Sequence, residues 1–103
     1  RKATIAAIEV PLQTMKLAAA ILPVTLAMVR EGNPNSITDA GVGALCIEAA
    51  VKGAGMNVKI NAASLDDEDA KLKYFREAED LIQKTTAAVR EIIAEVENRL
   101  LPS

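Results

Sequence analysis

The chain has 103 residues, half of them apolar and a quarter charged, which is the composition of one small globular domain. Its 12 basic and 14 acidic residues give a net charge of −2, so no nucleic-acid surface is expected. Because the chain has no His and a single Cys, His-dependent triads, His-bearing zinc sites and an intrachain disulfide are excluded, and the lone thiol favours a reducing, cytoplasmic compartment.

The longest uncharged apolar stretch runs from Leu17 to Val29 and contains Pro23. It is shorter than the roughly 20 residues that cross a bilayer, so no membrane contact is expected. The sequence begins RKAT, without Met, as expected for a fragment, a processed product or part of a longer chain. No segment alternates apolar and polar residues with a period of two, so we predict three long helices and no sheet.

The first predicted helix extends from Ala3 to Arg30. Pro11 and Pro23 each remove an amide donor and should kink or interrupt it. Apolar residues at alternating spacings of three and four form a seam for packing, and a second apolar stripe lies beside it. The seam comprises Ile5, Ile8, Leu12, Met15, Ala19, Leu22, Leu26 and Val29, and the second stripe comprises Leu17, Ile21, Val24 and Met28. A helix so apolar should be covered by further helices.

The second predicted helix extends from Ile37 to Ala62, after a turn that starts at Gly32. Ser36 and Asp39 have the spacing of a capping box. Small residues are frequent, and interior glycines imply the close approach of another helix or of a flat ligand. One helical stripe starts with small residues and ends in two amides, and it comprises Ala40, Gly43, Ile47, Ala50, Ala54, Asn57 and Asn61.

The third predicted helix extends from Asp66 to Leu100, with Ser64 and Asp67 as a second capping box. Its charged residues are expected to be a solvated surface. Its apolar stripe comprises Leu72, Phe75, Ile82, Val89, Ile93, Val96 and Leu100. Three such helices predict an all-α antiparallel bundle, and the excess apolar surface predicts that helices from a missing N-terminal half or from a second chain complete it.

Asp39 and the pair Asn57 and Asn61 are the main candidates for chemistry. Asp39 follows a polar turn and lies beside small residues, but a capping carboxylate would show the same pattern. The two Asn side chains lie one turn apart, where they could recognise a planar heterocycle or form hydrogen bonds between helices. From the residues alone both alternatives stay open.

Other polar residues have simple structural explanations as well. Asn33 and Asn35 flank Pro34 in a turn and are turn-forming residues. Lys59, like Lys52 and Arg30, could meet an anionic ligand or belong to a solvated face. The DDED cluster at residues 66–69 lacks the spacing of a calcium loop. The remaining candidate, Cys46, is expected to be a small buried apolar residue.

Three motifs and their spacing resemble the C-terminal half of the cyclodeaminase/cyclohydrolase family. They are EVPL at residues 9–12, GN at 32–33 followed by TDAGVGAL at 38–45, and GAGMNVKIN at 53–61. The family comprises the cyclodeaminase domain of formiminotransferase-cyclodeaminase and the methenyltetrahydrofolate cyclohydrolases similar to it. The resemblance implies that residues 1–103 are the C-terminal half of a single helical domain whose N-terminal half carries a Gly-rich PGGGS-type segment.

The resemblance also implies chemistry on tetrahydrofolate. Either N10 of 5-formimidoyltetrahydrofolate attacks the formimidoyl carbon and ammonia leaves, or water adds to 5,10-methenyltetrahydrofolate and opens its ring. Metal-free acid–base catalysis by Asp39 is implied, with Asn57, Asn61, Asn33 and Lys59 binding substrate. No cofactor is implied besides the folate substrate, and a homo-oligomer such as a homodimer is expected. The alternative is a non-catalytic helical dimerisation or scaffold module that retains the fold.

Overall fold

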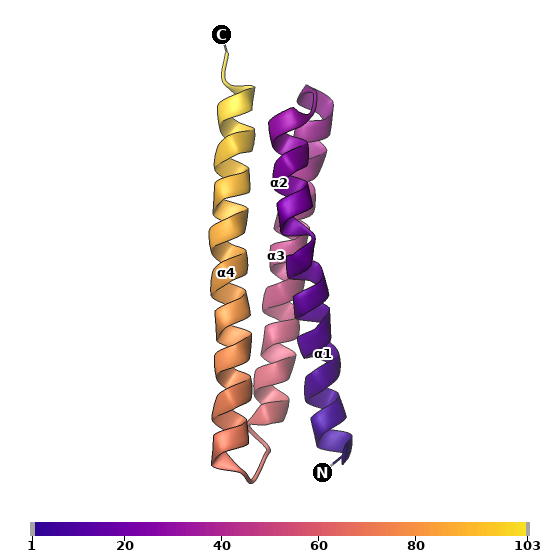
Figure 1. The fold of residues 1–103 in the computed structure, drawn as a ribbon, viewed down its shortest axis with the longest axis vertical. Helices are drawn as coiled ribbons and strands as arrows, with labels where there is room; N and C mark the ends of the chain where they lie inside the picture. Colours follow the sequence, from indigo (N-terminus) through magenta and orange to yellow (C-terminus); the bar gives the residue numbers. More distant parts are fainter. Residues whose placement is uncertain (1, 103) are drawn as a thin grey trace.

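The computed structural model describes residues 2–102, and their side chains from Ile5 onward. This part of the chain contains four helices and no strand, namely α1 (Lys2–Ala20), α2 (Leu22–Glu31), α3 (Pro34–Ala62) and α4 (Glu68–Leu100). They form a rod with extents of 58 × 17 × 15 Å, in which α3 runs antiparallel to both α1–α2 and α4 (Figure 1). The predicted all-α antiparallel bundle is confirmed, with the first helix divided in two.

The division of the first helix follows from its second proline. Ile21 separates α1 from α2, and Pro23 occupies the first turn of α2, where a missing amide is tolerated. Around the break, the Ile21 amide donates to the Ala18 carbonyl at 3.2 Å, a tighter turn than in an α-helix. Pro11 remains inside α1. The predicted interruption is therefore confirmed at Pro23.

The core is a line of aliphatic side chains along the rod. The predicted seam of the first helix is confirmed, since Ile8, Leu12, Met15, Leu22 and Val29 are buried. They pack in two clusters, one at each half of the rod, against α3 and α4. The seam on α4 is rotated from the prediction: Leu72 and Leu100 are about half exposed, while its buried residues are Tyr74, Ala78, Thr85, Val89, Ile92 and Val96.

Both predicted capping boxes are wrong by about one turn. α3 begins at Pro34 because the Asn33 side chain accepts a hydrogen bond from the Ser36 amide, so Ser36 lies inside the helix. α4 begins after Asp67, whose carboxylate accepts from the amides of Asp69 and Ala70. The hydroxyl of Ser64, the predicted cap, instead donates to a carbonyl at the end of α3.

The glycines of α3 divide between two faces. A Cβ on Gly41 would lie 3.1 Å from Val96, and one on Gly55 would lie 2.8 Å from Ile82, so these two glycines permit close packing against α4. A Cβ on Gly43 or Gly53 would meet nothing within 4 Å. The predicted close approach of another helix is therefore confirmed at Gly41 and Gly55, while at Gly43 and Gly53 the approach of a further helix or of a flat ligand stays a prediction.

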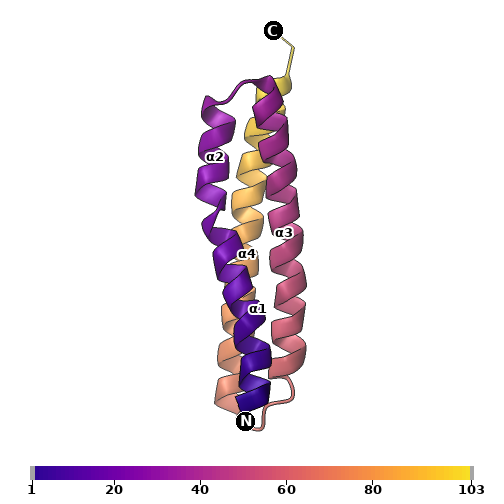
Figure 2. The same ribbon diagram turned by 90° about the vertical axis from the view of Figure 1, so that its right-hand side faces the viewer.

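α1, α2 and α3 together present a face directed away from α4, which we call the open face (Figure 2). The second apolar stripe of the first helix lies exposed, and so do Cys46 and Ala50 of α3. The prediction that Cys46 is buried is wrong for this chain taken alone. The stretch Ile5–Glu31 is also long and apolar enough, by length and composition, to cross a membrane, unlike the shorter stretch considered above. One such stretch is equally typical of a bundle helix, and its seam is buried here.

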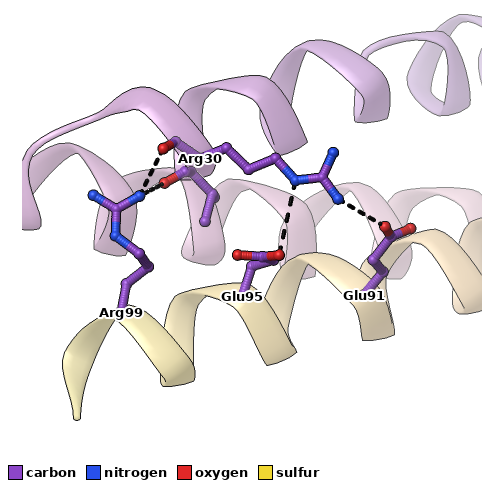
Figure 3. A network of polar contacts seen from close by, with 5 residues as sticks. Arg30, Glu91, Glu95 and Arg99 are labelled. Atoms are coloured by element: carbon purple, nitrogen blue, oxygen red, sulfur yellow. Dashed lines mark hydrogen bonds and ion pairs between the residues drawn. The ribbon is translucent and has the colours of Figure 1, made fainter.

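The end of the rod near the α2–α3 turn is fastened by two arginines (Figure 3). The Arg99 guanidinium, in the last turn of α4, donates to the carbonyls of Val29, Arg30 and Gly32 at 2.7–2.9 Å. These carbonyls end α2 and have no helical amide partners. Arg30 itself pairs with Glu91 at 3.2 Å and Glu95 at 3.8 Å. The prediction that the charged residues of α4 form only a solvated surface is therefore wrong for Arg99, Glu91 and Glu95, which contact α2 or the turn after it.

Replacing Arg99→Ala should lower the free energy of unfolding by about 1–3 kcal/mol, because the terminal carbonyls of α2 lose a charged donor. Arg90→Ala, at an exposed position of the same helix, is the matched control and should change it by about 0.5 kcal/mol or less. Urea unfolding followed by circular dichroism measures both. Equal effects of the two substitutions would contradict the capping role.

Candidate functional site

Asp39 lies in the second turn of α3, with its side chain exposed on the open face. Because Asn33 caps the helix, the carboxylate is free of the capping role that was its structural alternative. No hydrogen bond or ion pair joins it to another described residue. Asp39 is therefore an unengaged acid beside bare backbone at Gly43.

Asn33 has a structural role at the start of α3. Its side-chain oxygen accepts the Ser36 amide at 3.0 Å, which satisfies one of the free donors of the first turn. Pro34 then occupies the first helical turn, where its fixed φ suits the helix. Substrate binding by Asn33 remains a prediction, while its hydrogen bond to the backbone explains why an amide stands here.

Asn61 bridges α3 and α1 at the opposite end of the rod. Its Nδ2 donates to the Ala7 carbonyl at 3.3 Å and to the Asn57 carbonyl at 2.9 Å. The Ala7 carbonyl would receive the amide of residue 11 in an ordinary helix, but Pro11 has none. Asn61 thus supplies the donor that Pro11 removes, which is the interhelical role anticipated as one of its two alternatives.

Asn57 lies one turn before Asn61, and its carboxamide is exposed. It lines a shallow groove of about 400 Å³ between α1 and α3, with Ala7, Val10, Pro11, Thr14, Ala54 and Asn61 as the other lining residues. The groove is open to solvent, and polar and apolar atoms line it in equal measure. A carboxamide at its edge can present both a donor and an acceptor to a planar ring.

Lys59 lies on a different side of α3 from the two amides. Its ammonium contacts the Glu79 carboxylate of α4 at 2.6 Å. The hydrogen bond and charge of Lys59 hold the pKa of Glu79 below its ordinary value of 4.5. The expected grouping of Lys59 with Asn57 and Asn61 is therefore not observed, because Lys59 belongs to the α3–α4 contact.

The candidate residues do not form one pocket within this chain. Asp39 and Asn57 are separated by eighteen residues of continuous helix, a rise of about 27 Å. Eighteen residues are five turns, so the two side chains project from the same face while lying far apart. Within one copy, Asn57 is therefore too far from Asp39 to contact it. Only Asn57 and Asn61 are neighbours.

Glu9 and Tyr74 form a polar pair that was not predicted from the sequence. The Tyr74 hydroxyl donates to Glu9 at 2.8 Å and joins α1 to α4. This hydrogen bond, with burial of the ring, raises the pKa of Tyr74 above its ordinary value of 10.0. A buried tyrosine requires a partner for its hydroxyl, and that requirement was the signal available in the sequence. A larger apolar groove of about 460 Å³, between α2 and α4, contains none of the predicted residues.

Comparison with known proteins agrees with the motifs. A family described as formiminotransferase-cyclodeaminase matches residues 1–80. A methenyltetrahydrofolate cyclohydrolase of Methylorubrum extorquens is 30% identical over 94 residues, which cover 91% of this chain and 45% of that protein. A formimidoyltransferase-cyclodeaminase of Dictyostelium discoideum is 30% identical over 98 residues, covering 95% of this chain and 18% of that protein. The chain thus spans less than half the length of either relative.

A double-mutant cycle tests the bridging role of Asn61. Asn61→Leu should lower the free energy of unfolding by about 0.5–1.5 kcal/mol, because the Ala7 carbonyl loses its donor. In a Pro11→Ala background the new amide at position 11 serves this carbonyl, so the same substitution should cost less. Chemical unfolding of the four proteins measures the coupling, and an equal cost in both backgrounds would contradict it.

The Lys59–Glu79 pair should respond to pH in a defined direction. Its folded-state carboxyl pKa is lowered, so its stabilisation is present above about pH 4.5 and is lost as the pH falls through the lowered pKa. Lys59→Met should raise the pKa of Glu79 toward 4.5, measured by NMR titration of the side-chain carboxyl. An unchanged titration curve would show that the ion pair does not form in solution.

Proposed function

This chain belongs to the formiminotransferase-cyclodeaminase family of folate one-carbon proteins, and on that premise we propose that it is the C-terminal half of an enzyme that forms or hydrolyses 5,10-methenyltetrahydrofolate. The observation that carries the proposal is the combination of this match with an unengaged carboxylate, Asp39, inside one of the matching motifs. The missing half or a further chain would cover the open face of α1, α2 and α3.

The two candidate reactions place the same demands on the site. Loss of ammonia from the formimidoyl adduct and addition of water to the methenyl group both pass through a tetrahedral carbon between two nitrogens. Each step moves a proton to or from nitrogen or oxygen, which one positioned carboxyl group can do. Asp39 is the proposed acid–base group, because it is exposed and has no capping duty. Whether the site catalyses loss of ammonia or addition of water is set by residues outside this chain.

Asn57 is the stronger of the two amide candidates for contact with the substrate. Its carboxamide is exposed at the groove between α1 and α3, whereas the donor of Asn61 is already used by backbone carbonyls. A pterin ring presents alternating donors and acceptors that a free carboxamide can match. Lys59 could meet the folate carboxylates only by leaving Glu79.

A scaffold role is the second candidate function. It is favoured by one observation, the separation of about 27 Å between Asp39 and Asn57 along α3. A scaffold module would keep the buried apolar seams and the contacts of Arg99 with the α2–α3 turn. It would not need Asp39 and Asn57 to lie close together. The assay below decides between the two.

Asp39→Asn should reduce turnover by at least about tenfold, because the amide cannot exchange a proton at this position. The free energy of unfolding should change by about 0.5 kcal/mol or less, since the carboxylate is exposed and caps nothing. The near-ultraviolet absorbance of methenyltetrahydrofolate measures turnover in both directions, with formimidoyltetrahydrofolate and methenyltetrahydrofolate as substrates.

Asp66→Asn, at an exposed position before α4, is the matched control and should retain full turnover. If the protein together with its completing half changes the absorbance in neither direction, both reactions are rejected and the scaffold role stands. Full turnover of Asp39→Asn would leave the family assignment intact and remove Asp39 from the chemistry.

A further inference from the structure

The larger groove, of about 460 Å³, lies between α2 and α4, beside the break in the first helix at Ile21. It is found where the two core clusters of the rod meet, because its wall includes Leu81, which packs on one cluster, and Leu22, which belongs to the other. The wall is almost entirely apolar, and the small side chains of Ala20 and Ala88 leave room between the helices. The volume lies within the range of sites that bind small molecules.

The wall of this groove contains one buried hydroxyl, that of Thr85 in α4. Thr85 is only 1% exposed, and its hydroxyl has no hydrogen-bond partner among the described residues. The hydroxyls of Thr14, Thr25 and Thr38 behave differently, since each donates to a carbonyl in the preceding turn of its own chain segment. A buried hydroxyl without a partner is destabilising, so Thr85 indicates a polar group that the described chain does not supply.

The helix break leaves a hydrogen-bond acceptor at the same groove. In an unbroken helix the carbonyl of Ala19 would accept the amide of residue 23, but Pro23 has none. Ala19 and Pro23 both line the groove, on the side formed by α1 and α2. The groove therefore contains a hydroxyl donor on one side and a carbonyl without its helical donor on the other. A ligand hydroxyl matches this pair of groups, because it both donates and accepts.

The charged groups at the rim of the groove are already paired. Lys84 contacts Asp80 at 3.0 Å, and Glu91 contacts Arg30 at 3.2 Å (Figure 3). A charged ligand would have to displace one of these partners, and burial of an unpaired charge is costly. The groove therefore favours a neutral ligand, in contrast to a folate with its carboxylates.

We propose that the groove between α2 and α4 binds a neutral ring compound that carries one hydroxyl, and that Thr85 recognises this hydroxyl. The apolar wall supplies affinity by removing ring surface from water, and Thr85 distinguishes the hydroxylated ring from the bare hydrocarbon. Neither Asp39 nor Asn57 lines this groove, so the proposal goes beyond the proposed function and does not depend on it.

The probes 1-naphthol and naphthalene, which differ by one hydroxyl, test the site in the protein together with its completing half. Two-dimensional NMR should show that both probes shift the methyl signals of Leu22, Leu81 and Ile92. Thr85→Val keeps the shape of the side chain, and it should weaken binding of 1-naphthol by about fivefold or more while changing that of naphthalene by less than about twofold. The same substitution should not lower the free energy of unfolding, because it removes an unpartnered hydroxyl.

Ala88→Leu fills the groove and should weaken binding of both probes by about tenfold or more. Ala87→Leu, at the neighbouring exposed position outside the groove, is the matched control and should change neither affinity. Equal weakening of both probes by Thr85→Val, the absence of binding, or methyl shifts outside the groove would overturn the proposal. Binding to this chain that is lost when the completing half is added would also overturn it, and would assign the groove to a helix of that half.

Discussion

A helix in a bundle of three has two neighbours, so only about half of its circumference is covered, and this limit governs the whole molecule. α3 is apolar or small on nearly every side, yet α1, α2 and α4 cover only its inner side. Gly41 and Gly55 face those neighbours, while Gly43 and Gly53 face away. The open face, the exposed thiol and the unengaged Asp39 all follow from this surplus of apolar surface over available partners.

The prolines show how far the sequence could specify the fold. Each removes one amide, so a break near Pro23 was predictable from covalent structure alone. The starts of α3 and α4 were misplaced because several polar residues in a row compete for the capping position. Pro34 at the first turn was the sign that favoured Asn33, since proline is suited to that position.

The candidate site was predictable in part. The separation of Asp39 and Asn57 needs only their numbers and the helical rise. The contacts of Lys59 with Glu79 and of Asn61 with Ala7 join residues twenty and fifty-four positions apart. They depend on how the helices align lengthwise, and the apolar seams allow more than one alignment. The side of α4 that faces the core was also mispredicted, because its aliphatic residues are too frequent to define a single stripe.

The hydrogen bonds from Arg99 to the carbonyls at the end of α2 influence the order in which the bundle folds during synthesis. A ribosome delivers α1, α2 and α3 before the last turn of α4, so the carbonyls at the end of α2 emerge without their donor. Until the last turn of α4 has been made, the carbonyls in the connection between α2 and α3 form hydrogen bonds with water. The joint between α2 and α3 is therefore secured only after the last turn of α4 has been made.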